Sequence, residues 1–133
     1  MAGVWRDLLI PPREVIRGEG LYSWSANKVR IEVWDTADEA AAFLISEALR
    51  ASGANPQVCF GHTPHAQVRL LPSDLAPEHY RLELEPTCIS ISGDVAGRLY
   101  GAATLVEVIE RNGLKRLPCG VVNDGPDFSR RAL

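Results

Sequence analysis

Residues 80–109 read YRLELEPTCISISGDVAGRLYGAATLVEVI and contain two patterns of apolar residues. In the first half, Tyr80, Leu82 and Leu84 alternate with charged residues, and Ile89 and Ile91 then alternate with serines. A period of two is typical of strands that have one buried and one wet face. The turn signal Pro-Thr between the two runs predicts that they pair as antiparallel neighbours.

The second half of this stretch predicts a helix. Asp94 is the expected N-cap, and the helix should run to about Arg111 and end at Asn112-Gly113. Its predicted core stripe consists of Leu99, Ala102, Ala103, Val106 and Ile109. Gly97 and Gly101 lie inside the helix, where each glycine costs about 1 kcal/mol relative to alanine. Two glycines four residues apart therefore suggest that another backbone packs very close to this helix.

An earlier helix is predicted from Thr36 to about Ala51. Thr36 and Glu39 have the spacing of a capping box, in which the two side chains satisfy each other's backbone N–H groups. Gly53 is the expected residue just beyond the helix end. The predicted apolar stripe consists of Ala41, Leu44, Ile45, Ala48 and Leu49.

The remaining segments read as short strands separated by turns. The predicted strands are Glu14–Arg17, Gly20–Trp24, Lys28–Trp34, Gln57–Phe60, Gln67–Leu71 and Leu117–Val122. The order of elements predicts an α+β fold with a mixed, mainly antiparallel sheet and two helices packed on one of its faces. Residues 1–123 are expected to form a single domain, and residues 124–133 a tail that leaves it.

The composition suits one soluble domain with its own core. The chain has 133 residues, a hydrophobic fraction of 46% and a net charge of −3. We expect no nucleic-acid partner, because such binders carry a basic stripe. We also expect no membrane partner, because no apolar stretch approaches the length of a spanning helix. The start of the chain does not resemble a signal peptide, which favours a cytoplasmic location without excluding secretion of a longer parent protein.

Reactive residues give only weak signals for a site. Cys59, Cys88 and Cys119 are too few and too widely spaced for a disulfide framework, so we expect free thiols. His62 and His65 have a spacing that two metal ligands can use, but Pro64 places them in a loop and no third ligand is evident. We therefore expect no metal and no cofactor.

Three further kinds of site are candidates. The carboxylate pairs Asp124 with Asp127 and Glu83 with Glu85 are candidate acid–base pairs, but a turn and a solvated strand face explain them better. An aromatic platform for stacking sugars would make the chain a carbohydrate-binding module, and a protein-interaction surface is a further alternative. The aromatic residues concerned are Trp5, Tyr22, Trp24 and Trp34.

Several linked motifs resemble family-20 glycoside hydrolases, the β-N-acetylhexosaminidases, in the domain that precedes their catalytic barrel. Related accessory domains precede the barrels of α-glucuronidases and other glycosidases, and they are the alternative resemblance. The family-20 domain carries an E-G-Y-x-L strand, an I-x-I strand and a helix of the form A-G-x-x-Y-G-x-x-T-L. This chain has matching residues from Glu78 to Leu105, with His79 in place of the glycine. A Leu-Pro turn follows at residues 117–118, and the segment 124–133 resembles the family's D-x-P-R-F-x-x-R-G-L, with Asp127 and Ala132 as departures.

The resemblance implies a zincin-like α+β accessory domain that stabilises or flanks a (β/α)8 catalytic barrel of the same polypeptide. It implies that an Asp–Glu pair in the barrel acts on a 2-acetamido sugar with help from the substrate's own acetamido group. It therefore implies that this chain has no catalytic residue of its own. Arg131 matches a family arginine that binds sugar hydroxyls in the full enzyme, as the planar fork of a guanidinium allows.

The remaining motif positions imply structural roles. They are Tyr80, Gly97, Tyr100, Gly101, Thr104, Pro126 and Phe128. A surface made for the barrel would be exposed in the isolated chain, and we expect that it would favour homo-oligomers, with Phe128 and Leu133 as candidate contacts.

Overall fold

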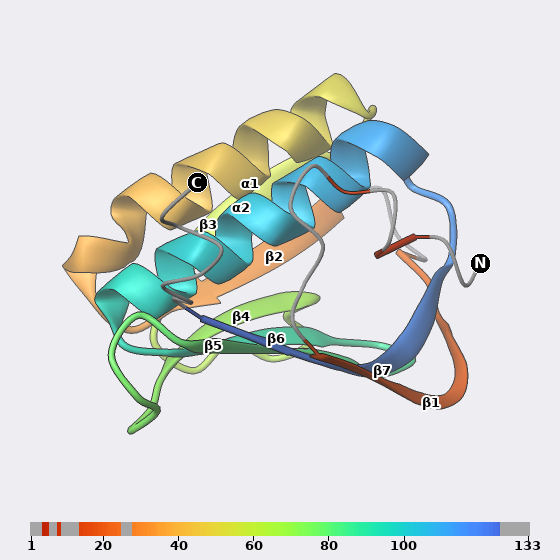
Figure 1. The fold of residues 1–133 in the computed structure, drawn as a ribbon. Coiled ribbons are helices and arrows are strands. Elements are labelled where there is room, and N and C mark those ends of the chain that lie inside the picture. The colour runs from red at the N-terminus through yellow and green to blue at the C-terminus, as the bar shows by residue number, and fades with distance from the viewer. Residues whose placement is uncertain (1–3, 6–7, 9–13, 25–27, 126–133) are drawn as a thin grey trace.

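The protein is a single mixed sheet with two helices lying side by side on one of its faces (Figure 1). The computed structural model describes residues 4–5, 8, 14–24 and 28–125. The strands are β1 (Glu14–Tyr22), β2 (Lys28–Val33), β3 (Asn55–Phe60), β4 (Val68–Pro72), β5 (Tyr80–Leu84), β6 (Ile89–Gly93) and β7 (Leu117–Asp124). The helices are α1 (Glu39–Ala51) and α2 (Val95–Asn112), and a 3-10 turn, η1 (Thr36–Asp38), precedes α1.

The seven strands are ordered β1-β7-β5-β6-β4-β2-β3. The pairs β1–β7, β7–β5 and β5–β6 are antiparallel, whereas β6–β4, β4–β2 and β2–β3 are parallel. The α+β class, the mixed sheet and the β5–β6 hairpin are therefore confirmed. The two orientations are equally frequent among the neighbouring pairs, so the sheet is less antiparallel than the sequence suggested.

The core lies between the sheet and the helices. Val29, Ile31 and Val33 of β2 are fully buried, as their alternation with charged residues predicted. The same alternation buries Val68 and Leu70 of β4 and the apolar residues of β5 and β6. The opposite face of the sheet carries the polar members of these strands, and we call it the open face.

Strand β1 differs from its prediction. The chain forms one strand from Glu14 to Tyr22 rather than two, and its pairing with β7 shifts register between Arg17 and Leu21. Gly20 has a φ of 87°, which glycine adopts without steric cost. The glycines that suggested a break therefore form a bulge inside a continuous strand.

The capping box predicted for α1 is wrong. The side chain of Asp35 accepts a hydrogen bond from the Ala37 N–H at 2.9 Å, and the chain makes a 3-10 turn before α1 begins at Glu39. The turn carries Asp38 into the interior, where it meets an arginine of α2. Gly53, with a φ of 97°, follows the helix end as predicted.

Both helices are rotated slightly from their predicted stripes. In α1, Leu44 is 40% exposed, while Ala42 and Ser46 are buried beside the predicted residues. In α2, Leu99 is 37% exposed and Ala103 is exposed, and the buried face is instead Gly97, Arg98, Gly101, Ala102, Leu105, Val108 and Ile109. The α2 face is shifted because its glycines must lie against the sheet and because Arg98 turns inward.

Candidate functional site

The motif residues of the second half assemble at one place, where β5 begins and α2 begins; we call it the β5–α2 junction. Asp94 caps α2, as predicted, by accepting from the Gly97 N–H at 2.7 Å. Its second oxygen accepts from the Glu78 N–H at 3.1 Å, which ties the loop before β5 to the helix. These backbone donors, with the Glu78 N–H first, hold the pKa of Asp94 below its ordinary value.

The two glycines of α2 explain how closely the layers approach here. A methyl group on Gly97 would overlap the carbonyl oxygen of His79, which is a backbone atom that cannot move freely. A methyl group on Gly101 would lie 2.6 Å from Cγ2 of Ile91 and 3.1 Å from the Tyr80 ring. The close approach inferred from the sequence is thus present, and Gly97 is where it is tightest.

Hydrogen bonds between side chains complete the junction. The hydroxyl of Tyr80 lies 2.7 Å from Oγ1 of Thr104, which donates to the backbone carbonyl of Tyr100 at 3.2 Å. The Tyr100 hydroxyl donates to Glu78 at 3.4 Å. The structure therefore brings together Tyr80, Gly97, Tyr100, Gly101 and Thr104, and their contacts are those of a packing motif.

A buried ion pair joins the two helices, and sequence reasoning missed it. Arg98 is 2% exposed and Asp38 is 1% exposed, with Nε of the arginine 2.9 Å and 3.0 Å from the two carboxylate oxygens. Arg98 also donates to the Gly93 carbonyl at 2.7 Å. The signal that could have revealed the pair is an arginine on the buried face of α2. Gly101, Ala102 and Leu105 follow Arg98 at helical spacing and are all buried.

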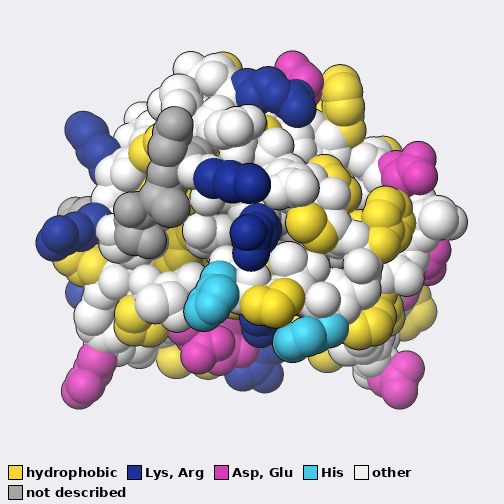
Figure 2. Space-filling view, turned by 180° about the vertical axis from the view of Figure 1, so that it is seen from behind, with side chains coloured by type: hydrophobic (Ala, Val, Ile, Leu, Met, Phe, Trp, Pro, Cys, Tyr) yellow, Lys and Arg dark blue, Asp and Glu magenta, His cyan; other side chains and the backbone are white. Residues whose placement is uncertain are grey.

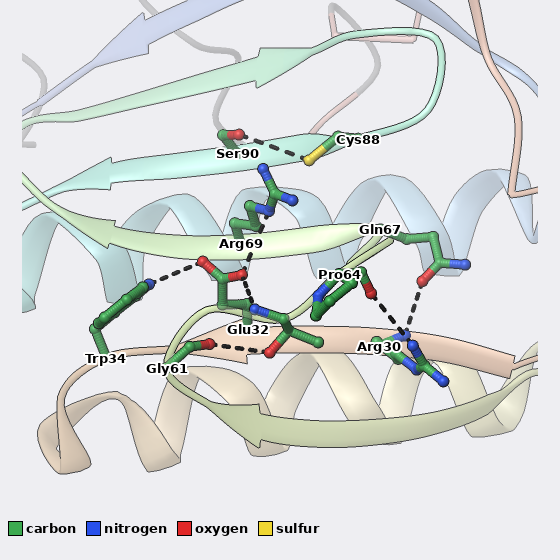
Figure 3. Close-up of polar contacts among 10 residues, drawn as sticks. Arg30, Glu32, Trp34, Gly61, Pro64, Gln67, Arg69, Cys88 and Ser90 are labelled. Carbon is green, nitrogen blue, oxygen red and sulfur yellow. Dashed lines mark hydrogen bonds and ion pairs between the residues drawn. The ribbon is translucent and has the colours of Figure 1, made fainter.

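A second polar network lies on the open face, with both helices behind it (Figure 3). Its centre is Glu32 of β2, which is only 3% exposed. The Trp34 indole N–H donates to one carboxylate oxygen at 2.8 Å, and the Thr63 N–H donates to the other at 2.8 Å. Nε of Arg69 lies 3.5 Å from that second oxygen. Both oxygens are engaged, so Glu32 anchors the β3–β4 loop and offers no free face to a substrate.

The aromatic platform is wrong. Trp5, Tyr22 and Trp24 are 6%, 0% and 3% exposed, and the rings of Tyr22 and Trp24 pack edge to face at 4.9 Å. Burial raises the pKa of the Tyr22 hydroxyl far above its ordinary value. Trp34, at 52% exposure, is the one member of the predicted platform with a solvent-facing ring.

The other candidate residues are scattered. His62 and His65 are exposed on the β3–β4 loop, and no metal-binding group of three or more His, Cys, Asp or Glu residues occurs within the described ranges. Glu83 lies 3.8 Å from Arg81 on the open face, and Glu85 is exposed. Cys59 and Cys88 are partly buried and Cys119 is buried, all as free thiols.

A hollow of about 450 Å³ lies beside the start of β5 and the end of β7. Its polar lining residues already have partners. Glu14 accepts from the Asn123 side chain at 2.8 Å, and the His79 ring hydrogen-bonds the Pro77 carbonyl at 3.0 Å. On the face seen in Figure 2, basic, acidic and apolar side chains are interspersed.

Part of the prediction falls outside the described residues. Pro126, Asp127, Phe128, Arg131 and Leu133 all lie there, so the sugar-binding role of Arg131 and the contacts of the tail stay predictions. Within residues 4–5, 8, 14–24 and 28–125, no helix is long and apolar enough to cross a membrane.

Comparison with known structures shows the same fold inside larger proteins. The chain aligns with an N-acetyl-β-hexosaminidase of Streptomyces plicatus with a TM-score of 0.76 and 24% identity, over 92% of this chain and 26% of that one. It aligns with a β-N-acetylhexosaminidase of Streptomyces coelicolor A3(2) with a TM-score of 0.71 and 25% identity, over 87% and 26%. For an exo-β-N-acetylglucosaminidase of Vibrio harveyi the values are 0.73 and 15%, over 90% and 19%.

The chain thus spans about a quarter or less of the lengths of these enzymes. No curated protein matched it in a comparison of sequences. The family model described as glycosyl hydrolase family 20, domain 2, matches residues 9–125, which is most of the chain. The chain therefore belongs to the domain 2 family of family-20 glycosyl hydrolases.

Proposed function

We propose that this domain is the non-catalytic flank of a β-N-acetylhexosaminidase whose chemistry takes place in a separate catalytic barrel. The match of residues 9–125 to domain 2 of the family carries this proposal. The state of the buried carboxylates supports it. Glu32 and Asp38 are held by backbone, indole or guanidinium N–H groups, which leaves neither free to protonate a glycosidic oxygen.

The outer surface of the two helices is the side that would meet the barrel. The helices run in the same direction (Figure 1), and the Arg98–Asp38 pair joins their N-terminal ends. Near those ends, four large apolar side chains face solvent: Phe43 at 61%, Leu44 at 40%, Val95 at 42% and Leu99 at 37% exposure. Val95 and Leu99 lie one turn apart on α2, and Phe43 and Leu44 are adjacent on α1. Exposed apolar side chains on helices that already have a filled core suit an interaction surface.

Two measurements test the catalytic part of the proposal. The 133-residue chain, incubated with an aryl 2-acetamido-glycoside, should release no phenol above the buffer rate. The gene beyond the codon for Leu133 should encode a barrel, and the complete product should hydrolyse the same substrate. Turnover by the short chain alone would refute the non-catalytic role.

The docking surface is tested in the complete polypeptide. Leu99→Lys places a charge in the proposed contact, and Ile16→Lys places the same charge on β1, where the side chain is 53% exposed. We expect Leu99→Lys to lower the unfolding temperature of the catalytic domain and Ile16→Lys to leave it unchanged. Equal effects of the two variants would show that the helix surface is not the contact.

We propose that Arg131 binds sugar hydroxyls in the complete polypeptide. Arg131→Lys should then raise KM more than it lowers kcat.

A further inference from the structure

The two outer strands of the sheet are protected very differently. Strand β1 carries Glu14, Arg17 and Glu19 and is interrupted by a bulge, and both features discourage pairing with another chain. Strand β3 lies at the other end of the sheet and has neither. The sequence contains no Asp, Glu, Lys or Arg between Arg50 and Arg69, a run that includes all of β3 and the loop after it.

The main-chain groups on the outer edge of β3 can be identified from its contacts. The Gly61 N–H, just after the strand, donates to the Val33 carbonyl of β2 at 2.8 Å. Consecutive residues of a strand direct their main-chain N–H and C=O groups to alternate edges of the strand. The main-chain groups of the odd-numbered residues of β3 therefore face β2, and those of the even-numbered residues face outward. Pro56, Val58 and Phe60 therefore point their main-chain groups away from the sheet. Pro56 suits this side because it has no N–H to offer a ladder.

Two large apolar side chains of β3 are exposed among its uncharged residues. Val58 is 40% exposed and Phe60 is 58% exposed, although their register partners Ile31 and Val33 on β2 are fully buried. An uncharged apolar edge strand is the kind of surface that adds a further strand.

We propose that β3 pairs antiparallel with β3 of a second copy of this chain, on a two-fold axis at Val58. A strand without charges meets its own copy without repulsion, and the two-fold axis makes every contact occur twice. Val58 then exchanges two N–H···O=C bonds with its copy, and each Phe60 N–H donates to the Pro56 carbonyl of the other copy. Because Pro56 has no N–H, one hydrogen bond is missing at each end of the ladder, while the two bonds at Val58 are unaffected.

This pairing does not depend on the proposed function, because it leaves the helix surface free. Cys59 provides a native probe of it. In this register Cys59 lies opposite Gln57 of the other copy, so the two Cys59 residues are diagonal neighbours about 7–8 Å apart. That separation is too long for a disulfide without backbone movement and suits a short bismaleimide.

The test combines sedimentation of the 133-residue chain with cross-linking. We expect reversible dimers whose dissociation constant rises at least about tenfold in Val58→Lys, since like charges would then face each other. Ile16→Lys on the β1 edge and Leu99→Lys on the helix surface are matched controls that should dimerise normally. The bismaleimide should yield dimers that disappear in Cys59→Ser and persist in Cys88→Ser.

A chain that stays monomeric at its highest soluble concentration overturns the proposal. So does a dimer that Leu99→Lys dissociates and Val58→Lys does not, because that result assigns the interface to the helices. If Val58→Lys folds poorly, the cross-linking experiment decides the matter without it. Cross-linked dimers that persist in Cys59→Ser would contradict the β3 pairing.

Discussion

Replacing Gly97 by alanine changes the free energy of unfolding in two opposite ways, through helix propensity and through steric overlap. On an exposed helix, Gly→Ala stabilises by about 1 kcal/mol. At Gly97 the new methyl group would overlap the His79 carbonyl oxygen and lie 2.8 Å from the carbonyl carbon and 3.0 Å from Oδ1 of Asp94. Overpacking of this kind costs about 1–3 kcal/mol, and the upper end applies because the obstacle is backbone. We therefore expect a net loss of about 1–2 kcal/mol.

The assay is denaturant unfolding followed by circular dichroism, with thermal melting as a second measure. The expected loss lowers the melting temperature by about 3–10 °C for a chain of this size. Two variants serve as controls. Ala103→Gly, at an exposed position of the same helix, should cost about 1 kcal/mol from helix propensity alone. Gly101→Ala should cost less than Gly97→Ala, because its nearest obstacles are side-chain atoms that can shift. A Gly97→Ala variant that melts above the unsubstituted protein would refute the reasoning.

Three further outcomes follow from the buried and capping groups. Arg98→Met leaves the Asp38 carboxylate buried without its partner and should cost about 3–5 kcal/mol in denaturant unfolding, while adding Asp38→Leu should restore part of the loss. Burial raises the pKa of the Cys119 thiol. In the folded protein at pH 8, Cys119 should therefore react with a disulfide reagent far more slowly than the partly exposed Cys59. In urea, the reaction rates of the two thiols should become equal. The pKa of Asp94 is lower in the folded protein than in the unfolded chain, so the ionised carboxylate stabilises the fold. This stabilisation is complete above the ordinary aspartate pKa and is lost as pH falls through the folded value. Asp94→Ala should therefore reduce the fall of the melting temperature with decreasing pH in that acidic range.

The parts of the fold that the sequence predicted best are those set by local pattern. The alternation in β2, β5 and β6 depends only on which residues are apolar, and it placed each strand to within a residue or two. Asp94 was identified as a cap because its position before a helical pattern admits few other roles. Parallel pairing was harder to foresee, since β2, β4 and β6 are far apart in the sequence and nothing local specifies their neighbours.

The misses at the start of α1 and on the buried face of α2 both involve a contact between distant residues. Asp38 and Arg98 are sixty positions apart, and their pairing draws the start of α1 into a 3-10 turn and rotates α2 about its axis. The capping box failed because Asp38 is pulled inward, and Asp35 takes over the capping. A periodicity argument treats each helix alone and cannot include such a pair.

Three carboxylates that lie inside the fold or cap a helix all have structural partners. A general acid needs a carboxyl group whose pKa is raised and whose proton faces a substrate. The described carboxylates at the centre of the fold are engaged in structural contacts instead. Glu32 accepts two N–H bonds and Asp38 meets a guanidinium. Asp94 accepts from the backbone N–H groups of Glu78 and Gly97, which lower its pKa. Each of them would have to give up a contact that joins two elements before it could bind a substrate proton. For these three carboxylates, holding the elements together and donating a proton to a substrate are therefore mutually exclusive roles.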